Sequence, residues 1–212
     1  IPVIKEDSGE IEDLQGRYLV LVKVSDQVGN INVYTSNGLI VEVQEPSVNI
    51  TGFDSTVYYS GDVPYTVNVS DNEGENIVSG IRKIQLWVKS TIGDETKTTF
   101  DKTYCVGYGD GAKDGYTLEE IGEIATKEIN ETVLASDNNS NNVTVTAKAY
   151  DQAGNETKEV SEALMIDTTD PVIEISYDNN DAVNQKYFRS GRTMTIKYTE
   201  RNFEESQATF DI

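Results

Sequence analysis

The sequence predicts an all-β chain of tandem antiparallel β-sandwich domains, and an internal repeat carries this prediction. Residues 18–30 read Y-L-V-L-V-K-V-S-D-Q-V-G-N, and residues 143–155 read V-T-V-T-A-K-A-Y-D-Q-A-G-N. Each residue of the first copy lies 125 positions before its counterpart (18 against 143). Both copies alternate with a period of two, which is typical of a strand with one buried face. The expected inward residues are Tyr18, Val20, Val22 and Val24 in the first copy and Val143, Val145, Ala147 and Ala149 in the second.

Both copies end in the same turn, Asp-Gln-x-Gly-Asn. Glycine accepts the positive φ that a tight turn requires, and an Asp side chain can accept hydrogen bonds from nearby backbone amides. The motif therefore predicts a hairpin. It favours a turn role for its aspartate over a catalytic one.

The repeat continues beyond the hairpin with the same spacing. Pro46 opens P-S-V-N-I, and Pro171, 125 residues later, opens P-V-I-E-I. Strand, hairpin, strand, proline junction and new strand recur in fixed order, which predicts tandem domains. We therefore expect residues 1–45 to be the closing part of one domain, 46–170 a complete domain and 171–212 the opening part of another.

Three motifs resemble the tandem bacterial immunoglobulin-like (Ig-like) domains of large surface and secreted proteins. They are D-Q-A-G-N, then I-D-T-T-D-P-V-I at residues 166–173, then M-T-I-K-Y at 194–198 leading into E-R-N-F. The resemblance covers most of the chain outside residues 91–135. It implies tandem Ig-like β-sandwiches in an extracellular, cell-surface protein of a bacterium of the Gram-positive type. The partners that it implies are neighbouring Ig-like repeats of a parent protein, together with a host or cell-wall glycan or protein.

Alternating patterns place the remaining strands. A returning strand is expected over residues 31–43, with a bulge or a step at Ser36-Asn37-Gly38. In the complete domain, strands are expected at residues 48–50, 65–69 and 81–88, and Ile84, Leu86 and Val88 should face inward.

Residues 91–135 form an insertion that the family pattern does not explain. Residues 96–102 are threonine-rich and strand-like, and the glycines of residues 105–116 indicate a loop. Thr117 and Glu120 have the spacing of a capping box. Apolar residues then recur at spacings of three or four, which predicts a short helix over residues 118–130, packed against the sandwich. This loop and helix either recognise a ligand or cover one end of the core.

The last part of the chain should contain strands at residues 172–175 and 194–198 and the start of a third near residues 208–210. Residues 1–45 and 171–212 would each leave an apolar face and open strand edges. We expect these faces to be completed either by adjoining repeats of a parent protein or by the other end of a second molecule.

Composition narrows the classes of function. The chain has 37 acidic against 17 basic residues, a net charge of -20, and such a surface repels nucleic acid and anionic lipid. There is no histidine, and Cys105 is the one cysteine, so the chain holds no zinc cluster, internal disulfide or Ser-His or Cys-His pair. No stretch has the roughly 20 apolar residues of a membrane-spanning helix. No carboxylate pair stands out in an apolar pocket, so we expect no enzyme activity.

Calcium is the one cofactor that the sequence leaves open. Hard cations take about six to eight oxygen ligands, and the candidates are Asp151 and Asn155 of the turn together with Asp167 and Asp170 of the junction. Asp71 and Glu73 follow a strand in the same domain. No EF-hand spacing occurs, and acidic residues beside turns are expected at this charge.

The favoured function is a structural spacer or adhesion stalk without catalytic activity. The alternative is a carbohydrate-binding or host-protein-binding module accessory to an extracellular enzyme. Its one weak candidate residue is Trp87, which falls on the outer face of its strand and either covers the sheet or offers a stacking surface for a sugar.

Overall fold

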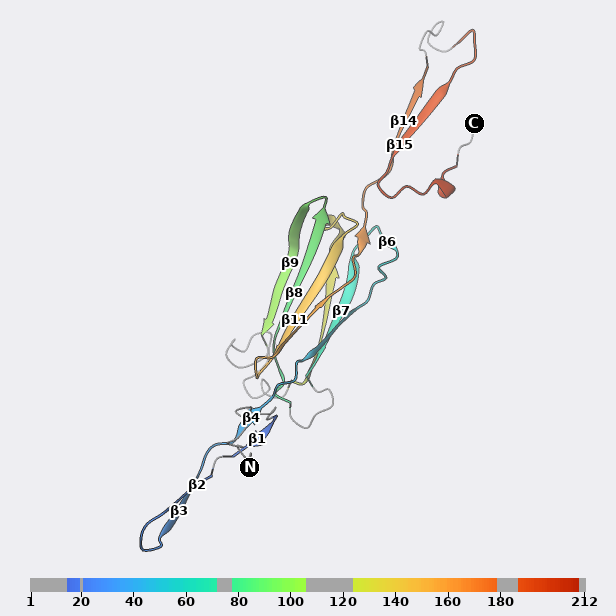
Figure 1. Cartoon of the computed structure of the whole chain (residues 1–212). Helices are drawn as coiled ribbons and strands as arrows, with labels where there is room; N and C mark the ends of the chain where they lie inside the picture. Colours follow the sequence, from blue (N-terminus) through green and yellow to red (C-terminus); the bar gives the residue numbers. More distant parts are fainter. Residues whose placement is uncertain (1–14, 20, 72–77, 106–123, 179–186, 210–212) are drawn as a thin grey trace, which may run out of the picture.

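The structure, a computed structural model, describes residues 15–19, 21–71, 78–105, 124–178 and 187–209 (Figure 1). The chain is all-β, as predicted, and its regular helices in these ranges are two single 3-10 turns, at Ala135–Asp137 and Glu205–Gln207. The strands are β1 (Gly16–Tyr18), β2 (Leu21–Ser25), β3 (Ile31–Thr35), β4 (Leu39–Val41), β5 (Ser47–Thr51), β6 (Tyr58–Tyr59), β7 (Val63–Ser70), β8 (Ile81–Ile92), β9 (Glu95–Cys105), β10 (Thr126–Val133), β11 (Val143–Asp151), β12 (Glu156–Val160), β13 (Met165–Ile166), β14 (Val172–Tyr177) and β15 (Met194–Thr199).

The central body, residues 47–166, consists of two antiparallel sheets that share one core. A three-stranded sheet has the order β10-β7-β5, and a four-stranded sheet has the order β12-β11-β8-β9. Their inward residues form a single cluster of buried side chains, from Val63 to Ile166. This sandwich-like arrangement buries the apolar face of each sheet against the other, which is what period-2 patterns require.

The predicted inward residues of the central body are confirmed. Ile84, Leu86 and Val88 of β8 are at most 1% exposed, and the four inward residues of β11 are fully buried. β11 lies between β8 and β12. It is therefore one of the two inner strands of its sheet, and it contacts the core through valines and alanines.

The N-terminal hairpins, residues 16–41, differ from the sequence prediction in burial. β1 pairs with β4 and β2 pairs with β3, so the predicted step at residues 36–38 is confirmed, because the returning strand changes partner there. The predicted burial of one strand face is wrong, since Val22 and Val24 are 50% and 55% exposed. Among the described residues no second sheet covers β2–β3, and without one a period-2 pattern has nothing to pack against.

The predicted helix over residues 118–130 is wrong where the structure describes it. Thr126–Val133 forms β10, which pairs antiparallel with β7 along its whole length. Ile129 and Val133 enter the core from this strand. Apolar residues four apart also fit one face of a strand, because four is a multiple of two, and the tertiary pairing decided between the two periods. The capping box and residues 118–123 lie outside the described residues, as does the proposed loop from residue 106 on.

The C-terminal hairpin, residues 172–199, consists of β14 and β15 in antiparallel pairing, as predicted. The strand expected near residues 208–210 is not seen in Ala208 and Thr209, which follow the 3-10 turn, and Phe210 lies outside the described residues. One further difference is that β6 and β13 pair in parallel, whereas only antiparallel pairs were expected.

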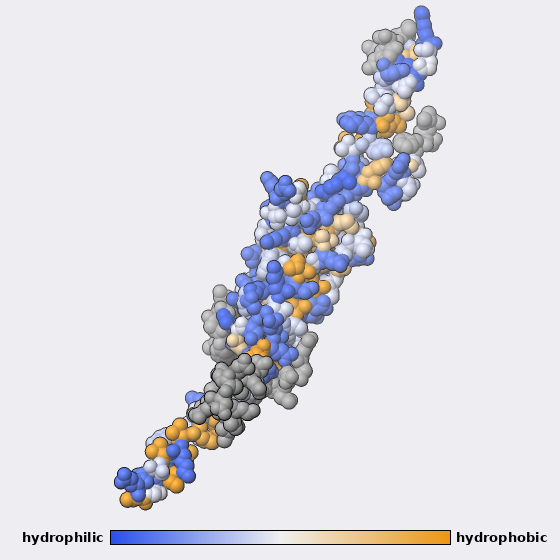
Figure 2. Space-filling view, in the orientation of Figure 1, coloured by the Kyte–Doolittle hydropathy of each residue, from blue (hydrophilic) through white to orange (hydrophobic). Residues whose placement is uncertain are grey.

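The N-terminal and C-terminal hairpins leave the central body at opposite ends, and the molecule is elongated (Figure 1). Apolar residues appear on the surface of the N-terminal end (Figure 2), in agreement with the exposure of β2 and β3.

Candidate metal centre at the first junction

The two Asp-Gln-x-Gly-Asn turns share the hydrogen bonds between the aspartate side chain and the asparagine four residues on, and they differ in the second amide that donates to the aspartate. Oδ1 of Asp151 accepts from the amides of Gly154 and Asn155 at 2.6 and 2.8 Å, and its Oδ2 accepts from Asn155 Nδ2 at 2.6 Å. Asp26 accepts from the amides of Val28 and Asn30 at 2.9 and 2.8 Å and from Asn30 Nδ2 at 2.6 Å. The glycines have φ of +98° and +93°, so both turns need glycine there. The predicted turn role of both aspartates is confirmed.

The two turns lie in different surroundings. Asp26 is exposed, whereas Asp151 is fully buried beside Glu42 and Asp71. One carboxylate oxygen of each of the three lies within 4.8 Å of the others, and we call Glu42, Asp71 and Asp151 the acidic cluster. Asp71 follows β7, and Asp151 ends β11. Glu42 follows β4 of the N-terminal hairpins, so the cluster joins two parts of the chain.

Hydrogen bonds attach the linker that contains Glu42 to the central body. The Ser79 amide donates to Glu42 Oε2 at 2.8 Å, and Asn155 Nδ2 donates to the Glu42 carbonyl at 3.3 Å. Farther along the linker, Thr157 Oγ1 donates to Glu45 Oε2 at 3.3 Å. We call this contact region the first junction.

Among the described residues, no basic side chain balances the charge of the acidic cluster. No lysine or arginine in the described part of the chain forms an ion pair with any of the three carboxylates. Burial raises the pKa of Asp71 to about 6, and the neighbouring charges of Glu42 and Asp151 add to this rise, against a lowering by the Gly80 amide. Buried like charges at this spacing require a proton or a cation between them.

The donor set of the cluster suits a hard cation. Three carboxylates carry two oxygens each, and Ca²⁺ takes about six to eight oxygens from carboxylates, carbonyls and water. Soft ligands are absent from the cluster, so its chemistry favours Ca²⁺ over Zn²⁺ or Cu²⁺. Bound there, the ion would neutralise Glu42 against the two aspartates and connect the linker with the central body.

The structure separates the four calcium candidates of the sequence into two groups. Asp151 and Asn155 lie at the first junction, at the end of β11, whereas Asp167 and Asp170 lie beyond the start of β11, at the opposite end of the central body. Asp71 could be predicted only from its place after a strand, Glu42 was not predicted, and Glu73 lies outside the described residues. The repeat spacing could have indicated Glu42, because it lies 125 positions before Asp167.

Asp167 belongs to a second junction, between the central body and the C-terminal hairpin. Nη2 of Arg201 lies 3.1 Å from Asp167 Oδ1 and 2.9 Å from the carbonyl of Ile166. Asn202 donates through Nδ2 to the same carboxylate. Partial burial alone would raise the pKa of Asp167. The hydrogen bond from the Thr169 amide, the charge of Arg201 and the hydrogen bond from Asn202 outweigh it, and together they lower the pKa of Asp167. An arginine thus compensates the acidic linker residue of this junction.

Trp87 lies half-buried on the outer face of the four-stranded sheet, as predicted. The ammonium group of Lys158 lies 6.0 Å from its ring centroid. Tyr150 of the neighbouring β11 is also on this outer face, with Lys83 and Lys148 at 4.4 and 4.8 Å from its ring. Lysines already contact both rings, so the arrangement fits a protected sheet surface better than an open stacking surface for a sugar.

Within the described ranges, none of the helices has the length and apolar character needed to cross a bilayer.

Comparison with known proteins does not identify a family for this chain. No protein-family model matches it, and no curated protein is significantly similar. Among solved structures, the chain is similar to a DUF4466 family protein from Parabacteroides merdae, with 11% sequence identity and a TM-score of 0.32. That match covers 66% of this chain and 50% of the other, so the chain spans about half the length of the structure it matches.

Proposed function

We propose that this chain is a segment of a structural spacer without catalytic activity, built from tandem Ig-like β-sandwich domains of a bacterial cell-surface or secreted protein. Its role would be to hold a distal binding or catalytic region at a distance from the cell. Neighbouring repeats of the same kind would be its principal partners.

The observation that carries this proposal is the recurrence, 125 residues apart, of a hairpin turn in which an aspartate accepts from the amide and the side chain of the asparagine four residues on. The linker after the first hairpin, residues 42–46, is bonded to the central body through Glu42 and Glu45. In the second linker, residues 167–171, Thr169 accepts from Asn139 of the central body, and Asp167 pairs with Arg201 of the C-terminal part. A chain of domains joined by such bonded linkers resists bending more than one joined by free loops, and stiffness is what a spacer needs.

The burial of the acidic cluster supports a role in structure over one in catalysis. Glu42, Asp71 and Asp151 are 7%, 5% and 0% exposed. Glycosidases place their two carboxylates on either side of a bond in an accessible substrate. A substrate has no comparable access to these three groups.

Two measurements test the spacer. Small-angle scattering of the 212-residue chain should give the long, thin profile of a stiff rod, and antibodies against residues 46–170 should label intact cells of the source organism. A compact scattering profile would contradict the stiff arrangement, and labelling that appears only after lysis would contradict the surface location.

A third measurement tests the domain limits. Residues 46–170, produced alone, should unfold in one cooperative transition and show the circular dichroism of β-structure. Several separate transitions, or a spectrum dominated by helix, would contradict an autonomous β-sandwich domain.

A further inference from the structure

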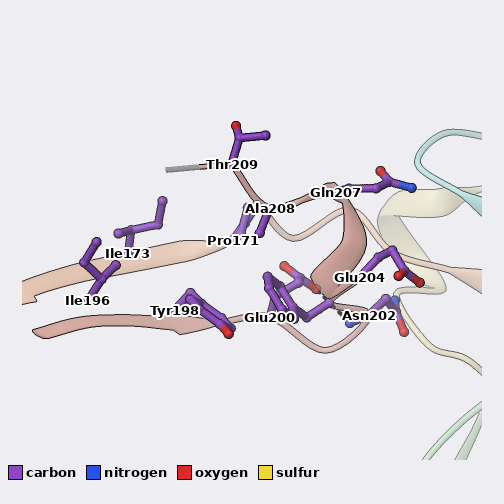
Figure 3. Close-up of a pocket in the computed structure, with 11 residues that line it drawn as sticks. Pro171, Ile173, Ile196, Tyr198, Glu200, Asn202, Glu204, Gln207, Ala208 and Thr209 are labelled. Atoms are coloured by element: carbon purple, nitrogen blue, oxygen red, sulfur yellow. Dashed lines mark hydrogen bonds between the residues drawn. The ribbon is translucent and has the colours of Figure 1, made fainter. Parts of the chain in front are cut away.

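The C-terminal hairpin has an apolar face that the described residues leave largely uncovered. Ile173, Ile175 and Tyr198 are 64%, 57% and 40% exposed, and Ile196 lies on the same face because it pairs with Ile175. Tyr198 stacks on Phe203 with ring centroids 4.1 Å apart. An open groove of about 390 Å³ lies on this face, and its apolar lining comes from Pro171, Ile173, Ile196, Tyr198, Phe203 and Ala208 (Figure 3).

The central body contains the corresponding face, on β5 and β7, and there a second sheet covers it. By the pairing registers, Ile173 and Ile175 correspond to Val48 and Ile50 of β5, and Tyr198 and Ile196 correspond to Val69 and Val67 of β7. Val67 and Val69 are at most 2% exposed. The four-stranded sheet covers them, and its strands β11 and β12 lie against β5. The covering element that this face requires is therefore a strand of the β11 kind.

The chain contains a second strand of that kind, and it is also uncovered. Val22 and Val24 of β2 correspond to Ala147 and Ala149 of β11, and they are about half exposed. β2 lies at the other end of the elongated molecule from the C-terminal hairpin (Figure 1), so the two faces cannot meet within one molecule. We propose that the β2–β3 hairpin of one molecule packs on the β14–β15 face of a second copy of this chain.

Charge at the second junction is complementary to this arrangement. Thr199 pairs with Val172 as Ser70 pairs with Ser47, so Glu200 corresponds to Asp71, and Asp167 corresponds to Glu42. A docked copy would bring Asp26, the counterpart of Asp151, close to Asp167 and Glu200. Arg201 is already bound to Asp167 there and supplies the positive charge that a third carboxylate needs.

The association joins different surfaces of the two molecules. A head-to-tail contact of this type is heterologous, and it extends into chains of molecules unless the rotation closes a ring. The inference does not rest on the spacer function, since it follows from the two uncovered faces and their registers.

Cross-linking tests the geometry. At the first junction, Thr157 Oγ1 and Glu45 Oε2 lie 3.3 Å apart, and their counterparts are Asn32 and Asp170. The triple variant Asn32→Cys, Asp170→Cys, Cys105→Ser should form a ladder of multimers with a short bis-maleimide. A matched variant with Glu174→Cys in place of Asp170→Cys presents the second thiol on the opposite face of β14 and should form little ladder. Absence of a ladder in the first variant, or equal ladders in both, would overturn the proposal.

Light scattering of the unmodified 212-residue chain provides the second test. The mean mass should rise with concentration, and the double variant Ile173→Asp, Ile196→Asp should remain monomeric with an unchanged melting temperature of the central body. Thr195→Asp, on the other face of β15, should associate as the unmodified chain does. A chain that stays monomeric throughout the series, or a double variant that still associates, would show that something other than a second copy covers this face.

Discussion

The two junctions of this molecule have an acidic residue at corresponding positions, Glu42 and Asp167, but they differ in how the charge of this residue is balanced. At the first junction, Glu42 lies in a buried cluster with Asp71 and Asp151, and no basic residue of the described chain pairs with them. At the second junction, the corresponding Asp167 is paired with Arg201 and Asn202. Both linkers lead from one β-unit into the next and are held by side-chain contacts.

This difference shows that the same backbone arrangement can balance the charge of its acidic linker residue in two ways. An internal arginine makes a junction independent of the solution, because the positive charge is part of the chain. Three buried carboxylates make a junction depend on protons or on a divalent cation. The first junction is therefore the one whose stability should respond to pH and to calcium.

The largest expected effect is that of calcium on the first junction. At a concentration of about 100 times Kd, a bound ion stabilises the folded state by about 2.7 kcal/mol, so millimolar CaCl₂ should raise the melting temperature by several degrees relative to EDTA. Scanning calorimetry should show that Asp71→Ala abolishes this rise and that Asp167→Ala retains it. If Asp167→Ala removed the rise and Asp71→Ala did not, the ion would belong to the second junction.

The two copies of the turn offer the next largest contrast. Asp151→Ala removes three hydrogen bonds from a buried site and should cost about 2 kcal/mol of unfolding free energy. Asp26→Ala also removes three hydrogen bonds, but from an exposed hairpin, where water replaces them, and it should cost less than about 0.5 kcal/mol. Urea denaturation measures both free-energy costs. It should be done in EDTA at pH 5, where Asp71 is largely protonated. Equal costs would mean that burial does not distinguish the two turns.

The pH dependence of stability should follow Asp71. Its pKa is about 6 in the folded protein, above the ordinary 3.8, so the folded state binds the extra proton between about pH 4 and 6. Stability in EDTA should therefore fall as the pH rises through this window and level off above about pH 6. Asp71→Asn removes the titrating group, and its melting temperature should exceed that of the unmodified chain at pH 7. If the melting temperatures of Asp71→Asn and of the unmodified chain changed with pH in the same way, this assignment would be wrong.

The smallest effect concerns Arg201. The side chain is about a third exposed, and its loss should change the stability of the central body by less than about 1 kcal/mol. The C-terminal hairpin should respond more, because Arg201 connects it to Asn139, Ile166 and Asp167. Hydrogen exchange of Arg201→Ala should accelerate in residues 172–199 and remain unchanged in β8 and β11. Unchanged exchange in the hairpin would show that Arg201 does not hold the second junction.

Strand patterns and turns were predictable from the sequence, because a period of two and an Asp-Gln-x-Gly-Asn turn are local properties. They predicted β5, β7, β8, β11, β14 and β15 and the turn role of Asp26 and Asp151. The same reasoning failed at residues 126–130, where spacings of three and four suited a helix. Pairing with β7 made them part of a strand, and pairing depends on residues more than 50 positions away.

The sequence alone determined the all-β class, the 125-residue repeat and the acidic character of the chain, since each depends on residue order or composition only. Tertiary structure alone decided which carboxylates meet. Glu42, Asp71 and Asp151 are far apart in the chain and come together because β4, β7 and β11 end at one place. Asp167 lies only 16 positions after Asp151 in the sequence (167 against 151), yet it lies at the far end of β11. Burial was likewise a tertiary property: the same strand pattern is buried in β11, where a second sheet covers it, and exposed in β2, where none of the described residues does.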